Sequence, residues 1–466
     1  MIYVRTHAYN AEKTLERAVD SILSQTYQNF EYHILDNGST DQTGKLIREY
    51  ARKDSRIVPY YNKVNRAFEE NPDFWNLSKK IPDGDYFCIL DADDCYEETF
   101  FEEMLDFMAE NRLEMAACGT VFVDGDSGRV VGDRVLPQSV LVNTPKRMDA
   151  YFPIIHWNLR QVWGKLYSSR AAAARYETDI PDWWPRAYGG DTINVMECVK
   201  AAGSFGVYGK ALHRYTVSRK SVSHQWIPGR ETADVTLHEK TLEFLRHQCG
   251  KVSVRNLRFL YLVYFNALKD TLAVWAGANL PFSEKLEILH RLFSQEIMRE
   301  TLAADMEEYG VGEAEKRELL QAIFQSLEKY GCAAADIPRL CAVCALWNPD
   351  FETLVPPERL GWYMEHIPGL MPSLALGKYP ESFHLLMEAV ESGCREDFPV
   401  ELARTLAALL GDQGAYILCS KLWIEALLRK GDLKQAEQEL TEWEAILPED
   451  RELAKLRKAF FGEGGT

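Results

Sequence analysis

The chain has 466 residues, 46% of them hydrophobic and 26% charged, which allows two or three domains of ordinary globular composition. Its formal net charge of -17 argues against a nucleic acid as the main partner, because nucleic-acid backbones are bound by an excess of Lys and Arg. It does not exclude a nucleotide, whose phosphates a divalent cation can bridge to carboxylates.

The N-terminal part of the chain alternates between apolar strands and helices. Strands are expected at residues 2–6, 30–35, 56–61, 86–90 and 115–123. Helices are expected after Asn10 and at residues 43–53, 74–80 and 99–111. The first helix has one buried apolar stripe, with Asn10 at the position of its N-cap. This alternation predicts a mostly parallel sheet covered by helices on both faces.

Polar residues follow the expected strands, among them the segment Asp91-Ala92-Asp93-Asp94. Ligands of parallel sheets bind beyond the carboxyl ends of the strands, so Tyr9, Asp36 and this segment are expected in one crevice. Two carboxylates about 4 Å apart repel by roughly 4 kcal/mol at an effective dielectric near 20, and a divalent cation removes that penalty. The segment indicates a Mg²⁺ or Mn²⁺ site for a phosphate-bearing substrate, or alternatively an acidic turn that caps the helix at residues 99–111.

The first part of the chain resembles family 2 glycosyltransferases, which have the GT-A fold. The matching segments, in the family's order and at its spacing, are residues 8–12, 21–27, 36–41 and 90–94. The resemblance implies a GT-A domain over residues 1–226, with a Rossmann-like sheet flanked by helices, and an all-α domain over residues 227–466.

At the donor site the resemblance assigns residues that contact the nucleoside. Tyr9 would flank the base, and Asp36 and Asn37 would contact it. Asp91 would touch the ribose, and Arg66 is assigned to the same nucleotide-sugar site. Many family members carry an acidic pair where this chain has Asp36-Asn37, and an Asn side chain brings a donor and no charge. A UDP-sugar is the expected donor, although Asn37 leaves the choice of nucleotide open.

The resemblance also implies a Mg²⁺ or Mn²⁺ ion that bridges the diphosphate. Asp93 would hold the ion, with Asp94 and His224 as further metal ligands. The alternative for His224 is a solvated loop side chain. Arg219 or Lys220 in the same loop could meet the diphosphate.

Asp191 opens a predicted helix and aligns with the family's Glu-Asp motif, in which Gly190 replaces the Glu. The resemblance implies that Asp191 is the catalytic base of an inverting transfer. The acceptor hydroxyl must lose its proton as it attacks the anomeric carbon, and a placed carboxylate contributes typically 10²–10⁴-fold. The alternative is that Asp191 only caps its helix. Trp183 and Trp184 precede it, and either bind a sugar face or pack in the core.

From about residue 227 onward helical patterns replace strand patterns. Residues 377–382 and 431–436 resemble the turn of a tetratricopeptide repeat, which places a repeat-like region at residues 370–460. The small side chains of Ser382 and Ala436 would let paired helices approach closely. Stacked helical hairpins of this kind offer a surface for a protein partner or for self-association. The alternative is a helical bundle that braces the first domain.

The cysteines and the hydropathy pattern bear on location. Ten cysteines are scattered along the chain, and no signal-peptide pattern is found, so free thiols in a reducing cytoplasm are expected. The most apolar stretch, residues 259–275, is interrupted by polar residues and predicts a buried helix rather than a membrane span. Peripheral association with the inner face of the membrane is left open.

These observations lead to one main hypothesis of function and two alternatives. The first is a metal-dependent, inverting glycosyltransferase that moves a sugar from a nucleotide diphosphate to a hydroxyl of a cell-surface glycan or lipid-linked acceptor. The second is an inactive GT-A domain that serves as a scaffold or binding module, which Asn37 and Gly190 favour and the intact acidic residues disfavour. The third, a nucleotidyltransferase, lacks the expected glycine-rich, basic phosphate loop after the first strand.

Overall fold

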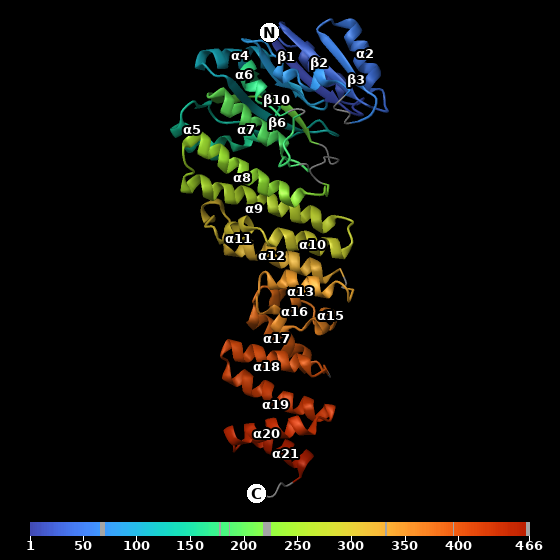
Figure 1. The fold of residues 1–466 in the computed structure, drawn as a ribbon, viewed down its shortest axis with the longest axis vertical. Helices are drawn as coiled ribbons and strands as arrows, with labels where there is room; N and C mark the ends of the chain where they lie inside the picture. The colour runs from blue at the N-terminus through green and yellow to red at the C-terminus, as the bar shows by residue number, and fades with distance from the viewer. Residues whose placement is uncertain are drawn as a thin grey trace. The chain divides into compact units, whose positions relative to one another are not determined.

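The computed structural model describes residues 1–65, 70–176, 179–185, 187–217, 225–330, 333–394 and 396–462. The chain divides into two units, one of Met1–Val274 with Ala304–Met306 and one of Trp275–Ala303 with Glu307–Thr466. The first unit is built on a sheet, and the described part of the second is helical (Figure 1). The predicted fold class, an α/β domain followed by an all-α region, is confirmed. The first unit extends beyond residue 226 and includes helix α8 (Arg230–Cys249) and most of α9 (Val254–Gly277).

The sheet of the first unit is mixed, with the strand order β3-β2-β1-β4-β9-β6-β10-β5. The strands are β1 (Ile2–Ala8), β2 (Phe30–Asn37), β3 (Ile57–Asn62), β4 (Tyr86–Ile89), β5 (Cys95–Tyr96), β6 (Met115–Asp124), β7 (Val130–Arg134), β8 (Val140–Val142), β9 (Lys165–Ser168) and β10 (Phe205–Val217). β1 runs parallel to its neighbours β2 and β4. The pairs β2–β3 and β6–β10 are also parallel. β9 lies antiparallel between β4 and β6, so the parallel order predicted for the first four strands does not continue across the whole sheet.

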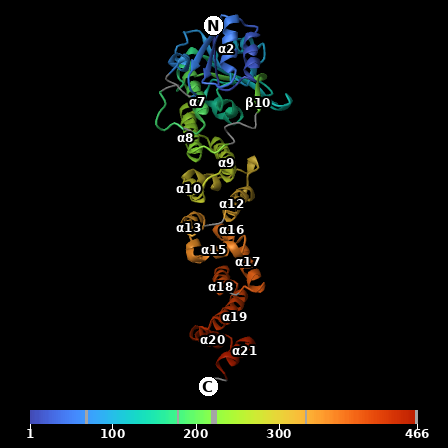
Figure 2. The same cartoon turned by 90° about the vertical axis from the view of Figure 1, so that its right-hand side faces the viewer.

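The two faces of the sheet carry separate hydrophobic cores. Because side chains alternate along a strand, Phe87 and Ile89 enter one core, whereas Cys88 and Leu90 enter the other. The second of these cores is covered by α1 (Leu15–Leu23), α2 (Thr43–Lys53) and α4 (Phe100–Asn111). The first is covered by α5 (Pro145–Ile155), α6 (Ser169–Ala173), α7 (Gly190–Ala202), α8 and α9 (Figure 2). The prediction of helices on both faces is confirmed.

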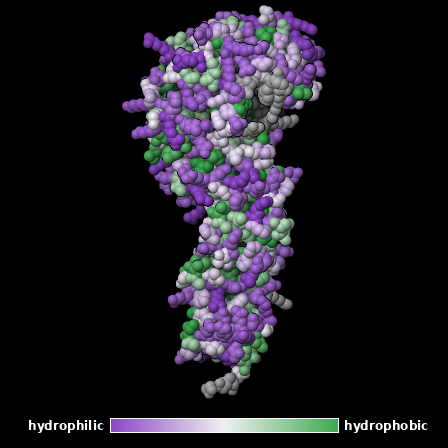
Figure 3. Space-filling model, in the orientation of Figure 1, coloured by the Kyte–Doolittle hydropathy of each residue, from purple (hydrophilic) through white to green (hydrophobic). Residues whose placement is uncertain are grey.

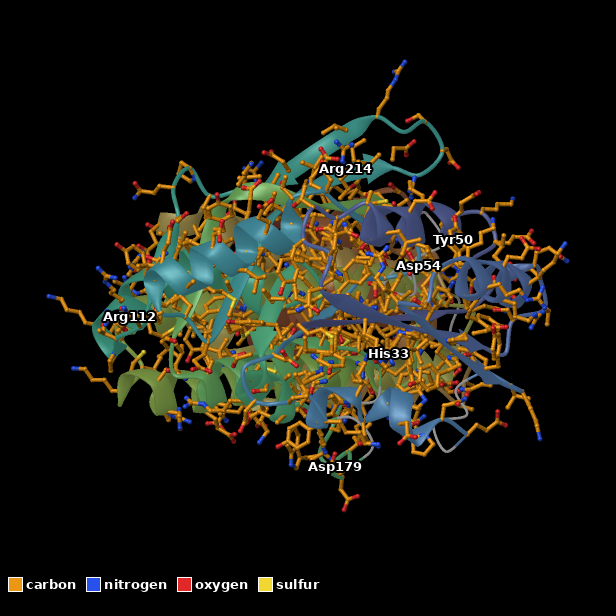
Figure 4. The ribbon with its side chains drawn as sticks, turned by 90° about the horizontal axis from the view of Figure 1, so that it is seen from above. His33, Tyr50, Asp54, Arg112, Asp179 and Arg214 are labelled. Carbon is orange, nitrogen blue, oxygen red and sulfur yellow. The ribbon has the colours of Figure 1, made fainter. Side chains whose placement is uncertain are left out.

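Short helical turns fill the remaining connections of the first unit. The helix predicted at residues 74–80 is a single turn α3 (Pro72–Trp75) followed by the 3-10 turn η1 (Leu77–Lys79), and η2 (His156–Leu159) continues α5. On the other side of the sheet, Tyr50 of α2 donates a hydrogen bond to Asp20 of α1 at 2.8 Å (Figure 4). This contact joins the two helices that follow β1 and β2.

The first helix begins later than its predicted N-cap at Asn10. α1 starts at Leu15, and Thr14 occupies the N-cap position. Asn10 has a left-handed backbone with φ 50°, a conformation that Asn tolerates better than most residues. Its Oδ1 accepts a hydrogen bond from the N–H of Thr40 at 2.9 Å. The cap prediction was wrong, because Asn10 uses its side chain to join the loop after β1 to the loop after β2.

The described part of the second unit consists of helices. They are α10 (Phe282–Phe293), α11 (Glu296–Ala303), α12 (Glu313–Glu328), α13 (Ile337–Ala345), α14 (Phe351–Leu354), α15 (Pro357–His366), α16 (Leu370–Ala375), α17 (Tyr379–Glu391), α18 (Phe398–Leu410), α19 (Gln413–Lys430), α20 (Leu433–Ile446) and α21 (Arg451–Phe461). Some pack on helices further along the chain, as α10 does on α13 and α12 on α16, and from α16 to α21 each helix contacts the next. Ser382 and Ala436 are fully buried, and the hydroxyls of Ser373 and Ser382 lie 2.7 Å apart. Small side chains therefore permit close helix contacts, while the tetratricopeptide character stays a prediction.

The face of the molecule shown in Figure 3 is mostly hydrophilic, with scattered hydrophobic residues. None of the helices within the described ranges is long and apolar enough to cross a membrane. The stretch at residues 259–275 lies in α9, where Leu260, Tyr264 and Leu268 are buried, so the predicted buried helix is confirmed. The cysteines that the structure describes all carry free thiols.

Candidate active site

Strands β1, β2 and β4 run in the same direction and end at the same edge of the sheet. Ala8, the last residue of β1, is in register with Asp36 near the end of β2. The N–H of Leu90, just after β4, donates to a carbonyl of β1 at 3.1 Å. Tyr9, Asp36 and Asp91 therefore start from neighbouring strand ends, and the Tyr9 side chain is 46% exposed.

Two glycines allow the segment after β2 to adopt its path. Gly38 has φ 76°, and an added Cβ would lie 2.5 Å from the carbonyl carbon of Val64. An added Cβ at Gly44, in the first turn of α2, would lie 2.2 Å from Oδ2 of Asp36. The other oxygen of Asp36 accepts the N–H of Ser39 at 2.9 Å. The buried Asp36 carboxylate is thus held between the loop and the start of α2.

Beside Asp36, four asparagine amides form a directed chain of hydrogen bonds. Asn71 donates to Asn62 at 2.6 Å, and Asn62 donates to Asn37 at 2.9 Å. Asn37 donates in turn to Asn65 at 2.9 Å. The partners of Asn37 were not anticipated from the sequence, because they come from β3 and the loop after it. Arg66 lies outside the described residues.

The acidic segment after β4 is tied to the C-terminal end of β10. Asp94 is fully buried, and its Oδ1 accepts the N–H of Thr216 at 2.8 Å. Its Oδ2 faces Nε2 of the buried His213 at 3.3 Å. Burial lowers the pKa of His213 to about 3, so this imidazole is neutral at physiological pH. Asp94 therefore positions β10 against the acidic segment.

Asp93 is the more exposed residue of the two, although its carboxylate is partly shielded from solvent by its surroundings. Its main-chain carbonyl accepts hydrogen bonds from Arg17 Nη2 at 2.8 Å and Thr216 Oγ1 at 2.5 Å. This side chain is therefore carried on a fixed backbone. Arg17 and Thr216 were missed by sequence reasoning, since they are distant in the chain and carry no local motif.

Burial and neighbouring carboxylates raise the pKa values of Asp91 and Asp94. Burial, and then the neighbouring charges of Asp94 and Asp93, raise the pKa of Asp91 well above its usual value. The charge of Asp191 contributes to the same shift, so Asp191 lies within electrostatic reach of the acidic segment. Burial also raises the pKa of Asp93. A cation between these groups would relieve the repulsion.

The donor set of the crevice fits a hard divalent cation. Mg²⁺ is commonly held by one or two carboxylates together with substrate phosphates, and Asp93 and Asp91 supply such carboxylates. Oδ2 of Asp94 and Nε2 of His213 are buried without a hydrogen-bond partner, although they face each other. Within the described ranges no group of three or more His, Cys, Asp or Glu side chains is arranged to hold a metal. His224, Arg219 and Lys220 lie outside those ranges.

Asp191 lies in the first turn of α7 and its side chain is exposed. The N-cap of α7 is Gly189, with φ 96°, so Asp191 stands inside the helix rather than at the cap position. An added Cβ at Gly189 would lie 2.7 Å from Leu237 Cδ1. The position of Asp191 in the first turn leaves its side chain open to solvent.

The glycine that replaces the family's Glu has a structural explanation. An added Cβ at Gly190 would lie 2.6 Å from Cζ2 of Trp184, so the indole ring occupies the space of a side chain at this position. Trp184 packs on the core of this face. Trp183 is 40% exposed, and the Lys240 Nζ lies 4.1 Å from its ring centroid. Of the two tryptophans, Trp184 thus serves packing, whereas Trp183 presents a face to solvent.

Lys165 is a fully enclosed cation behind Asp191. Burial lowers the pKa of Lys165 to about 7, and the charge of Asp191 opposes this shift. Its Nζ donates to the carbonyls of Gln161 at 2.5 Å and Trp163 at 3.2 Å. Nothing in the sequence pointed to this residue, because the burial of Lys165 depends on β9 entering the sheet.

A cavity that is partly open to solvent lies beside the first turn of α7. Its lining comes from η2, α7, α8 and α9, and consists of His156, Arg160, Thr192, Asp234, Leu237, His238, Thr241, Leu260, Val263, Tyr264 and Ala267. Thr192 directly follows Asp191, and its hydroxyl donates to the carbonyl of Arg160 at 3.2 Å. The cavity therefore borders the helix turn that carries the candidate base, and nothing in the sequence indicated it.

The histidines of this cavity predict a loss of stability in acid. Burial and the charge of Arg246 lower the pKa of His238 to about 4, so the folded chain keeps it neutral while the unfolded chain takes up a proton below about 6.5. Burial likewise lowers the pKa of His156 to about 3. The free energy of unfolding should fall as pH drops, by about 2.5 kcal/mol per histidine at pH 4.5. Denaturant titrations at pH 7 and 4.5 should show a smaller acid loss for His238→Gln than for wild type; equal losses would contradict this assignment.

Residues 4–157 match the family described as Glycosyl transferase family 2. An uncharacterized glycosyltransferase of Haemophilus influenzae is 30% identical over 158 residues, which are 34% of this chain and 58% of that protein. Glycosyltransferase GlyA of Streptococcus pneumoniae is 24% identical over 233 residues, which are 48% of this chain and 32% of GlyA. The chain thus spans less than two thirds of the length of these relatives.

Solved structures with a similar chain path have low sequence identity. S. aureus TarS 1-349 in complex with UDP-GlcNAc has 17% identity and a TM-score of 0.41, covering 82% of this chain and 91% of that one. The mannosyltransferase PcManGT from Pyrobaculum calidifontis in complex with GDP-Man and Mn²⁺ has 15% identity and a TM-score of 0.36. The match covers 71% of this chain and 87% of the PcManGT chain.

Proposed function

We propose that this chain, whose residues 4–157 match the family described as Glycosyl transferase family 2, is a metal-dependent, inverting glycosyltransferase. The donor would be a nucleotide-diphosphate sugar, and the acceptor a hydroxyl of a glycan or lipid-linked molecule. The observation that carries the proposal is that Asp36 and Asp91 lie at or just beyond neighbouring parallel strand ends, with Asp93 and Asp191 close enough for their charges to raise the pKa of Asp91. Such an arrangement offers a place for a cation, a diphosphate and a proton acceptor together.

The donor would lie across the ends of β1, β2 and β4. Tyr9 would flank the base, Asp36 and Asn37 would contact it, and Asp91 would meet the ribose. Mg²⁺ or Mn²⁺ held by Asp93 would stabilise the diphosphate as a leaving group. Arg66 and His224 stay assigned to this site by resemblance alone.

The reaction requires one proton transfer and one substitution. Asp191 would accept the proton of the acceptor hydroxyl as its oxygen bonds to the anomeric carbon. The bond from that carbon to the diphosphate oxygen then breaks on the opposite side, which inverts the configuration. Asp191 is exposed in the first turn of α7, where an acceptor can reach it.

Substitution of Asn37 by Asp is expected to change nucleotide preference. Asn62 can still donate to an aspartate, but the donor that faces Asn65 is lost. An aspartate would accept the N3–H of uracil through a charged hydrogen bond, whereas the N3 of cytosine is itself an acceptor. The ratio of UDP to CDP affinity should rise roughly fivefold, as expected for about 1 kcal/mol between neutral and charged hydrogen bonds. Calorimetric titration of both nucleotides measures the ratio, and an unchanged ratio would remove Asn37 from the base site.

The scaffold hypothesis is the second candidate, and exposed hydrophobic side chains in the helical unit favour it. Leu409 is 55% exposed, Leu433 49% and Ile446 63%, which suits a protein partner or self-association. Gly190 supports this alternative less, because Trp184 fills the space beside it. Light scattering across a concentration series tests self-association through these residues: a rising mass that Ile446→Asp abolishes supports it, and a constant monomer mass opposes it.

A screen of nucleotide sugars for slow donor hydrolysis tests the enzyme proposal without knowledge of the acceptor. Release of a nucleoside diphosphate from one donor, dependent on Mn²⁺ or Mg²⁺, is the expected result. Absence of both hydrolysis and nucleotide binding across the screen would favour the scaffold.

A further inference from the structure

Two arginines lie near the ring of one tryptophan, Trp157, in the first unit. The Cζ of Arg134 lies 3.2 Å from the ring centroid of Trp157, and that of Arg160 lies 5.9 Å from it. Arg134 belongs to β7, whereas Arg160 follows η2, so the fold brings the two guanidinium groups together. Burial and the charge of Arg160 lower the pKa of Arg134, which indicates that the like charges act on each other.

The two cations have no ion-pair partner among the described residues. The cavity beside Arg160 contains one carboxylate, that of the buried Asp234. Its oxygens accept hydrogen bonds from the hydroxyls of Tyr188 and Thr271, the latter at 2.9 Å. The charge of Arg160 makes only a minor contribution to lowering the pKa of Asp234. In a chain with net charge -17, two adjacent cations without a carboxylate partner favour an anionic ligand.

The two histidines of the cavity carry no positive charge with which to bind an anion. His156 and His238 are neutral at physiological pH, because burial lowers their pKa values to about 3 and about 4. They can still donate one hydrogen bond each. Arg160 therefore supplies the cationic charge of this cavity, with Arg134 next to it across Trp157.

The segment of Arg160 is joined to the first turn of α7, where Asp191 lies, because the Thr192 hydroxyl donates to the carbonyl of Arg160 at 3.2 Å. Thr192, which lines the cavity with Arg160, directly follows Asp191. Trp157 contacts Phe122, and Phe122 contacts Tyr215 with ring centroids 5.6 Å apart. Burial and the charges of the acidic segment raise the pKa of Tyr215 to about 12, so this ring borders the crevice. An acceptor could thus be bound by the arginines and present a hydroxyl to Asp191.

We infer that Arg134 and Arg160 bind an anionic group of the acceptor, a phosphate or a carboxylate, and hold its hydroxyl near Asp191. The inference rests on the proposed function, because it assigns the acceptor class of the same site. Guanidinium groups bind both anions through paired hydrogen bonds, and the two arginines would share one anion between them. A neutral acceptor would leave the pair without a ligand.

Saturation-transfer NMR with the full chain tests this inference using three small probes: glycerol 3-phosphate, glycerate and glycerol. The titrations are run alone and with UDP and Mg²⁺ present, so that binding at the donor site is recognised. We expect glycerol 3-phosphate or glycerate, and not glycerol, to bind under both conditions. Phosphate and carboxylate chemistry are distinguished by which of the two binds more tightly.

Arg134→Ala and Arg160→Ala should each weaken binding of the preferred probe at least tenfold. Arg129→Ala, an exposed arginine in the β6–β7 turn, is the matched control and should bind as wild type. Arg160→Lys keeps the charge and should recover part of the loss if the alanine variant folds poorly. Equal binding of glycerol, or an equal effect of all three alanine substitutions, would overturn the inference. Donor hydrolysis in the same preparations separates this failure from failure of the proposed function, which would abolish hydrolysis while leaving anion binding measurable.

Discussion

Replacing Asp191 by asparagine is expected to lower the rate of sugar transfer 10²–10⁴-fold, the range typical of a general base. Asparagine keeps the size of the side chain but cannot accept the proton of the acceptor hydroxyl. Because the side chain is exposed at the start of α7, its replacement disturbs little packing. The loss of a carboxylate at a helix N-terminus costs at most about 1 kcal/mol at an exposed site.

The measurement is kcat with saturating donor and acceptor, together with the Kd of the nucleotide. Asp182→Asn is the matched control, because Asp182 is an exposed carboxylate in the segment that precedes α7. We expect nucleotide binding to be unchanged in both variants and kcat to fall only for Asp191→Asn. A kcat within threefold of wild type would exclude Asp191 as the base.

The second large effect is expected for Asp93→Asn, which should remove most of the metal-dependent binding of the nucleotide. Removing a residue that only orients a metal-binding side chain typically costs 10–100-fold in metal affinity. Removing the metal-binding side chain itself should therefore cost on the order of 100-fold or more. The Asp93 backbone is held by Arg17 and Thr216 through its carbonyl, so the substitution leaves those hydrogen bonds in place. Removal of the metal with a chelator should reproduce the effect in wild type.

Asp83→Asn provides the control for Asp93→Asn, since Asp83 is exposed in the turn before β4. Asp94→Asn is a poorer test, because Asp94 is buried against Thr216 and His213 and its loss would also disturb β10. If Asp93→Asn binds UDP with the same metal dependence as wild type, the ion is held elsewhere.

The sequence allowed the first four strands and the polar residues at their ends to be predicted because these signals are local. Apolar runs followed by Tyr9, Asp36 and Asp91 indicate strand ends, and parallel pairing then places those residues at one edge. The antiparallel insertion of β9 was not predictable in this way. Its neighbours β4 and β6 are distant in the chain, and the burial of Lys165 follows from that insertion.

The missed parts of the site depend on contacts between distant segments. The amide chain through Asn37 requires β3 beside β2, and the cationic pair of Arg134 and Arg160 requires a hairpin to reach η2. Asn10 illustrates the opposite error, since a residue type that commonly caps helices instead joins two loops. Propensity describes the likeliest local use of a side chain, and tertiary contacts can override it.

The most direct test of the account is calorimetric titration of the chain with UDP, GDP and CDP, each with and without Mn²⁺. The central claim is that the crevice of Asp91 and Asp93 binds a nucleoside diphosphate through a divalent cation. It predicts that at least one nucleotide binds with Mn²⁺, and that this binding is lost with a chelator and in Asp93→Asn. Absence of binding by any of the three with Mn²⁺, or binding that neither the chelator nor Asp93→Asn affects, would contradict the claim.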